Sequence, residues 1–168
     1  MRATLQLDLR DRSGALVDCR RAANAVTRHG AALVAQAFSG QGTGITHMGV
    51  GTSDAPESDA FDTAALTNAG AGGQGPLTGD TDVALPAGTF SAPLVDEVKR
   101  VVKVRLHATL PDAAAIGTVR EAGLLSRGAG DPVLYNRVIF APVQKGADHE
   151  LTLFWEVAFP YGDLQWLQ

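Results

Sequence analysis

The chain has 168 residues, 45% of them hydrophobic, and its net charge of −4 comes from interspersed acids and bases. A chain of this length can bury most of its apolar surface in one core, which favours a single domain. No basic stripe offers the counterion release that drives nucleic-acid binding, and no apolar run reaches the roughly eighteen residues of a membrane helix. We therefore expect neither a nucleic-acid nor a membrane partner.

The N-terminus predicts a β-hairpin. Apolar and polar residues partly alternate from Ala3 to Leu9, and a turn signal precedes Ala15 to Cys19. The opening residues, MRATLQLDLRDR, lack a hydrophobic signal core, so we expect synthesis in a cytoplasm. Cys19 is the only cysteine, which excludes an internal disulfide and a thiolate-rich metal site.

A helix is predicted after the hairpin. Apolar residues recur at helical spacing between Thr27 and Phe38, with Thr27 available as the N-cap and Gly40 placed just past the end. A short strand from Ile45 to Val50 follows. The stretch 69–81 then carries five glycines and a proline without periodicity, which predicts a long surface loop or a mobile insertion.

Four strands are predicted in the second half. The segments Val98–Leu110 and 149–159 alternate apolar and polar residues, so each has one face toward a core and one toward solvent. Between them, GTVREAGLLSR and PVLYNRVIFAP, the second bounded by Pro132 and Pro142, have the length and composition of strands. The expected fold class is therefore mainly β, an antiparallel β-sandwich or Greek-key-like domain with one helix in the N-terminal half.

The segment GVGTSDAP, from Gly49 to Pro56, raises the question of a phosphate site, because glycine-rich turns can aim backbone amides at an anion. A Walker loop needs Lys and Ser or Thr after its second glycine, and a dinucleotide fingerprint needs a third glycine. The sequence has neither. Gly49 and Gly51 instead predict a close approach of the backbone to a neighbouring element, followed by a turn that ends the strand.

No catalytic, cofactor or metal residue is assigned from the sequence. The four histidines lack metal-ligand spacing, no serine lies in a Gly-x-Ser-x-Gly turn, and the acids between Asp54 and Asp62 lack EF-hand spacing. Charges embedded in apolar β segments are a separate case, because they are expensive to bury unless paired. We expect Glu121 and Arg137 to form an ion pair, either within the sheet or as part of a subunit contact.

Several short motifs occur in a fixed order. The chain carries VTRHG at 26–30, GVGTSDAP at 49–56, DTAAL at 62–66, REAGLL at 120–125, NRVIFAPVQK at 136–145 and LTLFWEVAF at 151–159. Together they resemble a group of virion proteins of tailed bacteriophages, prophages and phage-tail-like particles. The resemblance covers nearly the whole chain. It departs where the group is expected to carry a Glu-Arg pair and this chain has Asn68, Ala69 and Gly70.

The resemblance implies a non-enzymatic structural protein of a virion or tail-like particle, near the tail, baseplate or fibre attachment, assembled in a host bacterial cytoplasm. It implies homo-oligomeric or neighbour contacts with other virion proteins, and no cofactor. A capsid decoration or head-attached protein is an alternative within the same class. A carbohydrate-binding module is an alternative of another class, in which an aromatic ring would stack on a host-surface glycan. Among Tyr135, Trp155, Tyr161 and Trp166, Trp155 belongs to the apolar face of its strand, which leaves Tyr161 and Trp166 as the candidate platforms.

The chain end is the candidate interface. We expect one β-rich domain over residues 1–159, with its glycine-rich insertion at 69–81, and a C-terminal tail over residues 160–168. The tail is too short to form a core and carries an apolar and aromatic set typical of interface anchors. Its members are Tyr161, Leu164, Trp166 and Leu167. The tail either contacts a neighbouring subunit or folds back on its own sheet.

Overall fold

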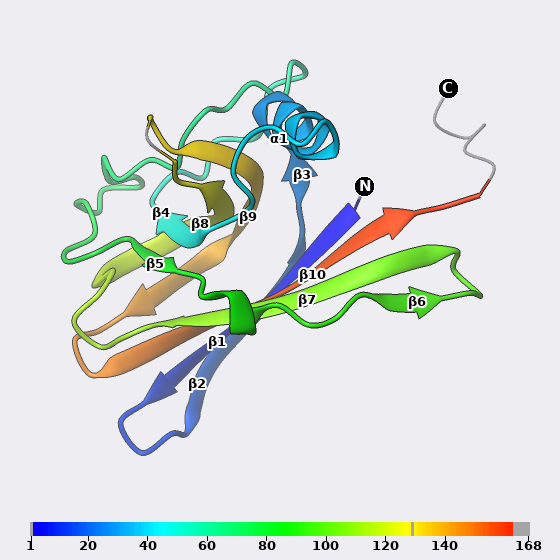
Figure 1. The fold of residues 1–168 in the computed structure, drawn as a ribbon. Coiled ribbons are helices and arrows are strands. Elements are labelled where there is room, and N and C mark those ends of the chain that lie inside the picture. The colour runs from blue at the N-terminus through cyan, green and yellow to red at the C-terminus, as the bar shows by residue number, and fades with distance from the viewer. Residues whose placement is uncertain (1, 129, 163–168) are drawn as a thin grey trace.

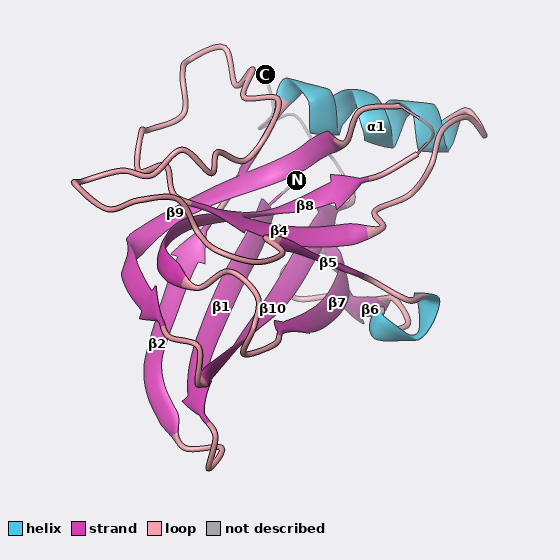
Figure 2. Ribbon diagram, turned by 90° about the vertical axis from the view of Figure 1, so that its left-hand side faces the viewer, coloured by secondary structure: helices cyan, strands magenta, loops and turns pink. Residues whose placement is uncertain are grey.

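The computed structural model describes residues 2–128 and 130–162, and in this part of the chain the strands form two antiparallel sheets of five strands each (Figures 1 and 2). The strands of sheet A are β1 (Arg2–Asp11), β2 (Leu16–Ala23), β6 (Leu94–Asp96), β7 (Val101–Leu110) and β10 (His149–Pro160), in the order β2-β1-β10-β7-β6. Those of sheet B are β3 (Ala25–Val26), β4 (His47–Gly51), β5 (Asp82–Ala84), β8 (Gly117–Ser126) and β9 (Val133–Lys145), in the order β3-β9-β8-β4-β5. The predicted mainly β class is confirmed.

The N-terminal elements follow the local signals in the sequence. Strands β1 and β2 form the predicted hairpin, and the helix α1 (Arg28–Phe38) starts where Thr27 Oγ1 accepts a hydrogen bond from the Gly30 N–H at 2.9 Å. Gly30 also has a packing role, because a Cβ there would lie 1.9 Å from the carbonyl oxygen of Tyr135 on β9. The missing side chain therefore lets α1 dock against β9 at one end of the sandwich (Figure 1).

The four predicted C-terminal strands are present, but they belong to different sheets. β7 pairs with β10 in sheet A, with Leu106 opposite Trp155, whereas β8 pairs with β9 in sheet B, with Gly123 opposite Arg137. Their sequences already differ. In β7 and β10 apolar and polar residues alternate, because one face of sheet A is open to solvent. In β8 most of the residues are buried, so the strand shows no such alternation.

Two predicted strand boundaries were wrong. Val98 is 95% exposed and lies in the turn between β6 and β7, a turn that Arg100 closes with a positive φ of 51°. Pro142 does not end its strand, because β9 continues to Lys145. The β8 and β9 ladder is irregular between Val119 and Glu121, and a proline is tolerated at such a bulge because no ladder N–H is needed from it.

The core lies between the inner faces of the two sheets. From sheet A it takes the apolar side of each alternating strand, including Leu5, Leu7, Leu9, Leu106, Leu110, Leu151, Leu153 and Trp155. From sheet B it takes Met48, Val50, Ala122, Leu124, Val138 and Phe140. Trp155 is only 1% exposed, and burying a large aromatic side chain of this kind contributes roughly 2–3 kcal/mol. The 3-10 helix η1 (Ala87–Thr89) and the loops surround this core.

The glycine-rich stretch 69–81 is fixed to the sandwich at defined points. Leu77 is 5% exposed, and Thr78 forms an isolated β-bridge with Ile116. The Asn68 side chain accepts a hydrogen bond from the Leu77 N–H at 2.7 Å and donates one to the Leu77 carbonyl at 3.1 Å. Asn68, one of the residues that depart from the resemblance, therefore holds this stretch in place at Leu77.

In the described part of the chain, no helix has the length and apolar character to cross a membrane.

Candidate functional site

Glu121 and Arg137 lie on neighbouring strands of one chain, on the face of sheet B that is turned away from sheet A. Arg137 Nε donates to Glu121 Oε2 at 2.5 Å, and the two residues are 5% and 0% exposed, respectively. Of the two arrangements left open by the sequence, this is the contact within the sheet. A buried pair of this kind is tolerated only if its remaining donors and acceptors are also satisfied.

The remaining polar atoms of the pair hold the segment 52–67. Arg137 Nη1 donates to the Ala55 carbonyl at 2.9 Å, and Nη2 donates to Ser53 Oγ at 3.1 Å. Glu121 Oε1 accepts the Thr67 N–H at 2.8 Å. The ion pair thus attaches both ends of this segment to the outer face of sheet B.

Gly49 and Gly51 make room for the same segment. A Cβ on Gly51 would lie 2.4 Å from Glu121 Oε1 and 2.7 Å from the Thr67 carbonyl oxygen. A Cβ on Gly49 would lie 3.1 Å from the Leu66 side chain, which rests on this face. The predicted close approach is confirmed, and the segment that approaches is 52–67. The two glycines are thus explained by packing.

The acids considered for calcium are engaged separately. Asp54 pairs with Arg120 at 3.0 Å, Glu57 accepts a hydrogen bond from the Thr63 hydroxyl at 2.5 Å, and Asp62 accepts one from Ser58 at 2.8 Å. Within residues 2–128 and 130–162, no three His, Cys, Asp or Glu side chains gather into a group that could hold a metal ion.

Lys145, at the end of β9, is a further buried charged residue. It is 0% exposed, and its Nζ donates to the carbonyl oxygens of Pro111 at 2.7 Å and Asp112 at 3.1 Å. Burial lowers the pKa of the Lys145 ammonium, because desolvation disfavours the charged form. The side chain therefore ties the end of β9 to the turn after β7.

The candidate interface residues fall at the edge of the described part. Tyr161 is 40% exposed, and its N–H donates to the Arg100 carbonyl at 3.0 Å. β10 includes Pro160, so the sheet extends into the segment that the sequence assigned to the tail. Leu164, Trp166 and Leu167 lie outside the described residues.

Two of the aromatic rings considered for sugar stacking are in the interior. Trp155 is 1% exposed and Tyr135 is 3% exposed, and burial raises the pKa of the Tyr135 hydroxyl to about 12. Phe154, which precedes Trp155, is instead 40% exposed. Because neighbouring residues of a strand point to opposite faces, Phe154 projects from the outer face of sheet A.

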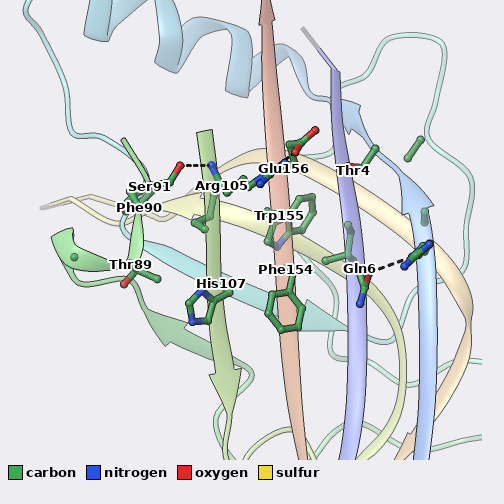
Figure 3. A pocket seen from close by; sticks show the side chains of 16 residues that line it. Thr4, Gln6, Thr89, Phe90, Ser91, Arg105, His107, Phe154, Trp155 and Glu156 are labelled. Carbon is green, nitrogen blue, oxygen red and sulfur yellow. Dashed lines mark hydrogen bonds and ion pairs between the residues drawn. The ribbon is translucent and has the colours of Figure 1, made fainter. Parts of the chain in front are cut away.

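That outer face holds a groove with a volume of about 870 Å³ (Figure 3). Its floor is built from paired positions of four strands, with Gln6 on β1 opposite Arg21 on β2 and Phe154 on β10, which is in turn opposite His107 on β7. The segment 88–91 forms a wall beside β7. We call this feature the sheet A groove.

Its side chains are held by contacts along the sheet. The His107 and Phe154 rings stack with centroids 5.6 Å apart, and Arg21 Nε donates to Gln6 Oε1 at 3.1 Å. Arg105 Nε donates to Glu156 Oε2 at 2.8 Å, and this bond lowers the pKa of the Glu156 carboxyl. The groove therefore presents an aromatic pair flanked by guanidinium groups.

The sequence contains one signal for this groove. In HELTLFWEVAF the outward positions carry Glu150, Thr152, Glu156 and Ala158, and Phe154 is the only large apolar residue among them. A single exposed ring is common on protein surfaces, and it becomes a sign of an interaction surface only where further apolar groups adjoin it. The other strands that contribute to the groove could not be found, because periodicity does not tell which strands are neighbours.

Comparison of the chain with protein-family models, with curated protein sequences and with solved structures finds no match in any of the three. The function is therefore inferred from the residues and their geometry. Two features stand out, namely the buried ion pair that fastens segment 52–67 to sheet B and the uncovered groove on sheet A.

Proposed function

We propose that this protein is a non-enzymatic structural component of a phage virion or phage-tail-like particle, in the tail, baseplate or fibre-attachment region. It acts through contacts with further copies of itself and with neighbouring particle proteins, and it is assembled in the host bacterial cytoplasm. A capsid decoration or head-attached role is the alternative within the same class. The sequence motifs of the resemblance and the uncovered surface of sheet A support the proposal in different ways.

Four of the six motifs of the resemblance meet in one structural unit. Gly49 and Gly51 of GVGTSDAP, Leu66 of DTAAL, Glu121 of REAGLL and Arg137 of NRVIFAPVQK are all in contact on the outer face of sheet B. Each has a packing or anchoring role in this unit. Motifs with that role fix a scaffold, and the other surfaces of the scaffold then remain free for contacts.

The observation that carries the proposal is the exposed apolar end of sheet A. The hairpin of β6 and β7 exposes Val95 by 64% and Val98 by 95%, and Tyr161 is exposed beside it at the end of β10. In Figure 1 this end of the sheet extends beyond sheet B. Apolar and aromatic side chains gathered at one exposed end favour a protein contact there.

The opposite edge of sheet A is protected against pairing. On β2 the Cys19 N–H donates to Asp18 Oδ1 at 2.7 Å, and the Cys19 carbonyl accepts from Arg20 Nη1 at 2.9 Å. Charged side chains that occupy the free backbone groups of an edge strand discourage edge-to-edge association. We therefore expect the contact surface at the β6 and β7 end and on the outer face of sheet A.

Purified particles test this proposal. Phage or tail-like particles from a host that encodes the chain are banded on a density gradient, and heads and tails are then separated and analysed by mass spectrometry. We expect the chain at a fixed ratio to the major tail proteins. Recovery with heads alone would favour the decoration role, and recovery only in the soluble fraction would contradict both.

A further inference from the structure

The sheet A groove combines an apolar floor with two cationic groups. Ala23 and Phe154 contribute apolar surface, Ala22 and Phe90 line the groove from positions packed against the core, and the rings of Phe154 and His107 lie side by side in Figure 3. Arg21 and Arg105 stand against one acid, Glu156. An occupant of matching chemistry would offer apolar side chains and a negative charge.

The segment 163–168, DLQWLQ, has that chemistry. It contains Leu164, Trp166 and Leu167, with one acid, Asp163, and no base. In an extended conformation Leu164 and Trp166 project from the same side. We propose that the sheet A groove of one copy receives the segment 163–168 of a second copy.

The part of the groove around Phe154 is out of reach of the same copy. Tyr161 still pairs with Arg100, so β10 carries the chain seven residues, about 23 Å, past Phe154. Trp166 is five residues beyond Tyr161 and can return at most about 17 Å even if fully extended. The occupant of the floor around Phe154 therefore comes from another molecule.

This contact joins two different surfaces of the chain. A contact between unlike surfaces is head-to-tail, and repeated copies then build a closed ring or an open row, depending on the rotation between neighbours. Both forms suit a particle component. The inference rests on the proposed function, because it takes copies of the chain to be neighbours.

Disulfide trapping between full-length variants tests the contact. In a Cys19→Ser background, one protein carries Thr4→Cys at the groove and a second carries Leu167→Cys. Thr4 is exposed and lines the groove, and no hydrogen bond of its side chain is seen among the described residues. The matched control replaces Thr4→Cys by Arg12→Cys, at the exposed turn between β1 and β2. The proteins are mixed, oxidised and separated on a non-reducing gel.

We expect cross-linked dimer at several times the level of the Arg12→Cys control, and we expect a synthetic peptide of residues 160–168 to suppress it. Dimer no more abundant than in the control would overturn the inference. A chain carrying both Thr4→Cys and Leu167→Cys that closes on itself without forming dimers would overturn it too, because the tail would then occupy its own groove. Suppression by an oligosaccharide but not by the peptide would assign the groove to a glycan.

Particle fractionation of the Phe154→Thr variant separates this inference from the proposed function. If cross-linking fails while the intact chain still bands with tails, the proposed function stands and the inference falls. If neither is seen, both fall. If the cross-link forms and Phe154→Thr reduces incorporation several-fold, the groove contact is the one used in the particle.

Discussion

Each sheet has an outer face. The outer face of sheet B is covered by a segment of the chain, whereas the outer face of sheet A is open. On sheet B the segment 52–67 lies over the face and is fastened there by Glu121 and Arg137, both almost fully buried. On sheet A the face is open, and its ion pair between Arg105 and Glu156 is partly exposed to solvent. An arginine and a glutamate thus hold segment 52–67 in place on sheet B, whereas a pair of the same residue types remains accessible to solvent on sheet A.

The difference shows how burial separates structural from accessible charge. A buried pair contributes through the penalty that follows when one partner is lost, whereas an exposed pair is screened and contributes little. Residues on the outer face of sheet A are therefore free to be used in contacts at small cost to the fold. Four predictions test this contrast.

The largest effect is expected for Arg137→Met. It leaves the Glu121 carboxylate buried without its cation, and we expect a loss of about 3–5 kcal/mol in the free energy of unfolding. The matched control is Arg105→Met, which removes the exposed partner of Glu156 and is expected to cost less than about 1 kcal/mol. Urea unfolding of both variants measures the difference. Equal losses would show that the two faces are alike.

A smaller effect is expected for Gly51→Ala. The new Cβ would lie 2.7 Å from the Thr67 carbonyl oxygen, a backbone atom, so segment 52–67 must shift, at a cost of about 1–3 kcal/mol. The control is Gly88→Ala in the wall of the sheet A groove, where a Cβ meets nothing within 4 Å and the change is expected to stay within about 0.5 kcal/mol. Thermal unfolding checks both. A neutral Gly51→Ala would mean that the segment is not held closely.

The sequence predicted the helix and the longer strands better than it predicted which strands pair. Thr27 and Gly40 mark the ends of α1 because capping is a local interaction, and alternation identified both faces of β7 and β10. Which strands belong to which of the two sheets was not predicted, because local patterns do not specify which strands pair. β6 was also missed, since three residues are too few to establish a period.

The same limit applies to the candidate site. Two charges in apolar strands sufficed to predict the pair of Glu121 and Arg137, because burial demands a partner. The groove needed β1, β2, β7 and β10 to be neighbours, and the pattern of no single strand specifies which strands it pairs with. Phe154 is the one aromatic ring at an outward position of β10, but the alternation within that strand does not indicate what lies beside it.

The pH dependence of the exposed pair gives a smaller effect. The hydrogen bond from Arg105, followed by the charge of Lys103, lowers the pKa of Glu156 below its ordinary value of 4.5. The carboxylate therefore adds stability above the unfolded pKa, and this contribution disappears as the pH falls through the folded pKa. The difference in unfolding free energy between the native chain and Glu156→Gln should be at most about 1 kcal/mol at pH 7 and should shrink as the pH falls below 4.5 and through the folded pKa. A difference that grows on acidification would contradict this assignment.

The smallest effect on stability is expected for Phe154→Thr. The ring is 40% exposed on the open face, and threonine keeps a side chain suited to a strand, so we expect a change within about 0.5 kcal/mol. Trp155→Ala, one position along the strand, should instead cost about 3–5 kcal/mol, because that ring fills the core. Chemical unfolding of both variants, run beside the disulfide trapping assay, separates folding from association. An exposed ring whose loss leaves the fold intact but abolishes the cross-link is positioned for a partner, whereas a large loss of stability would make Phe154 part of the scaffold.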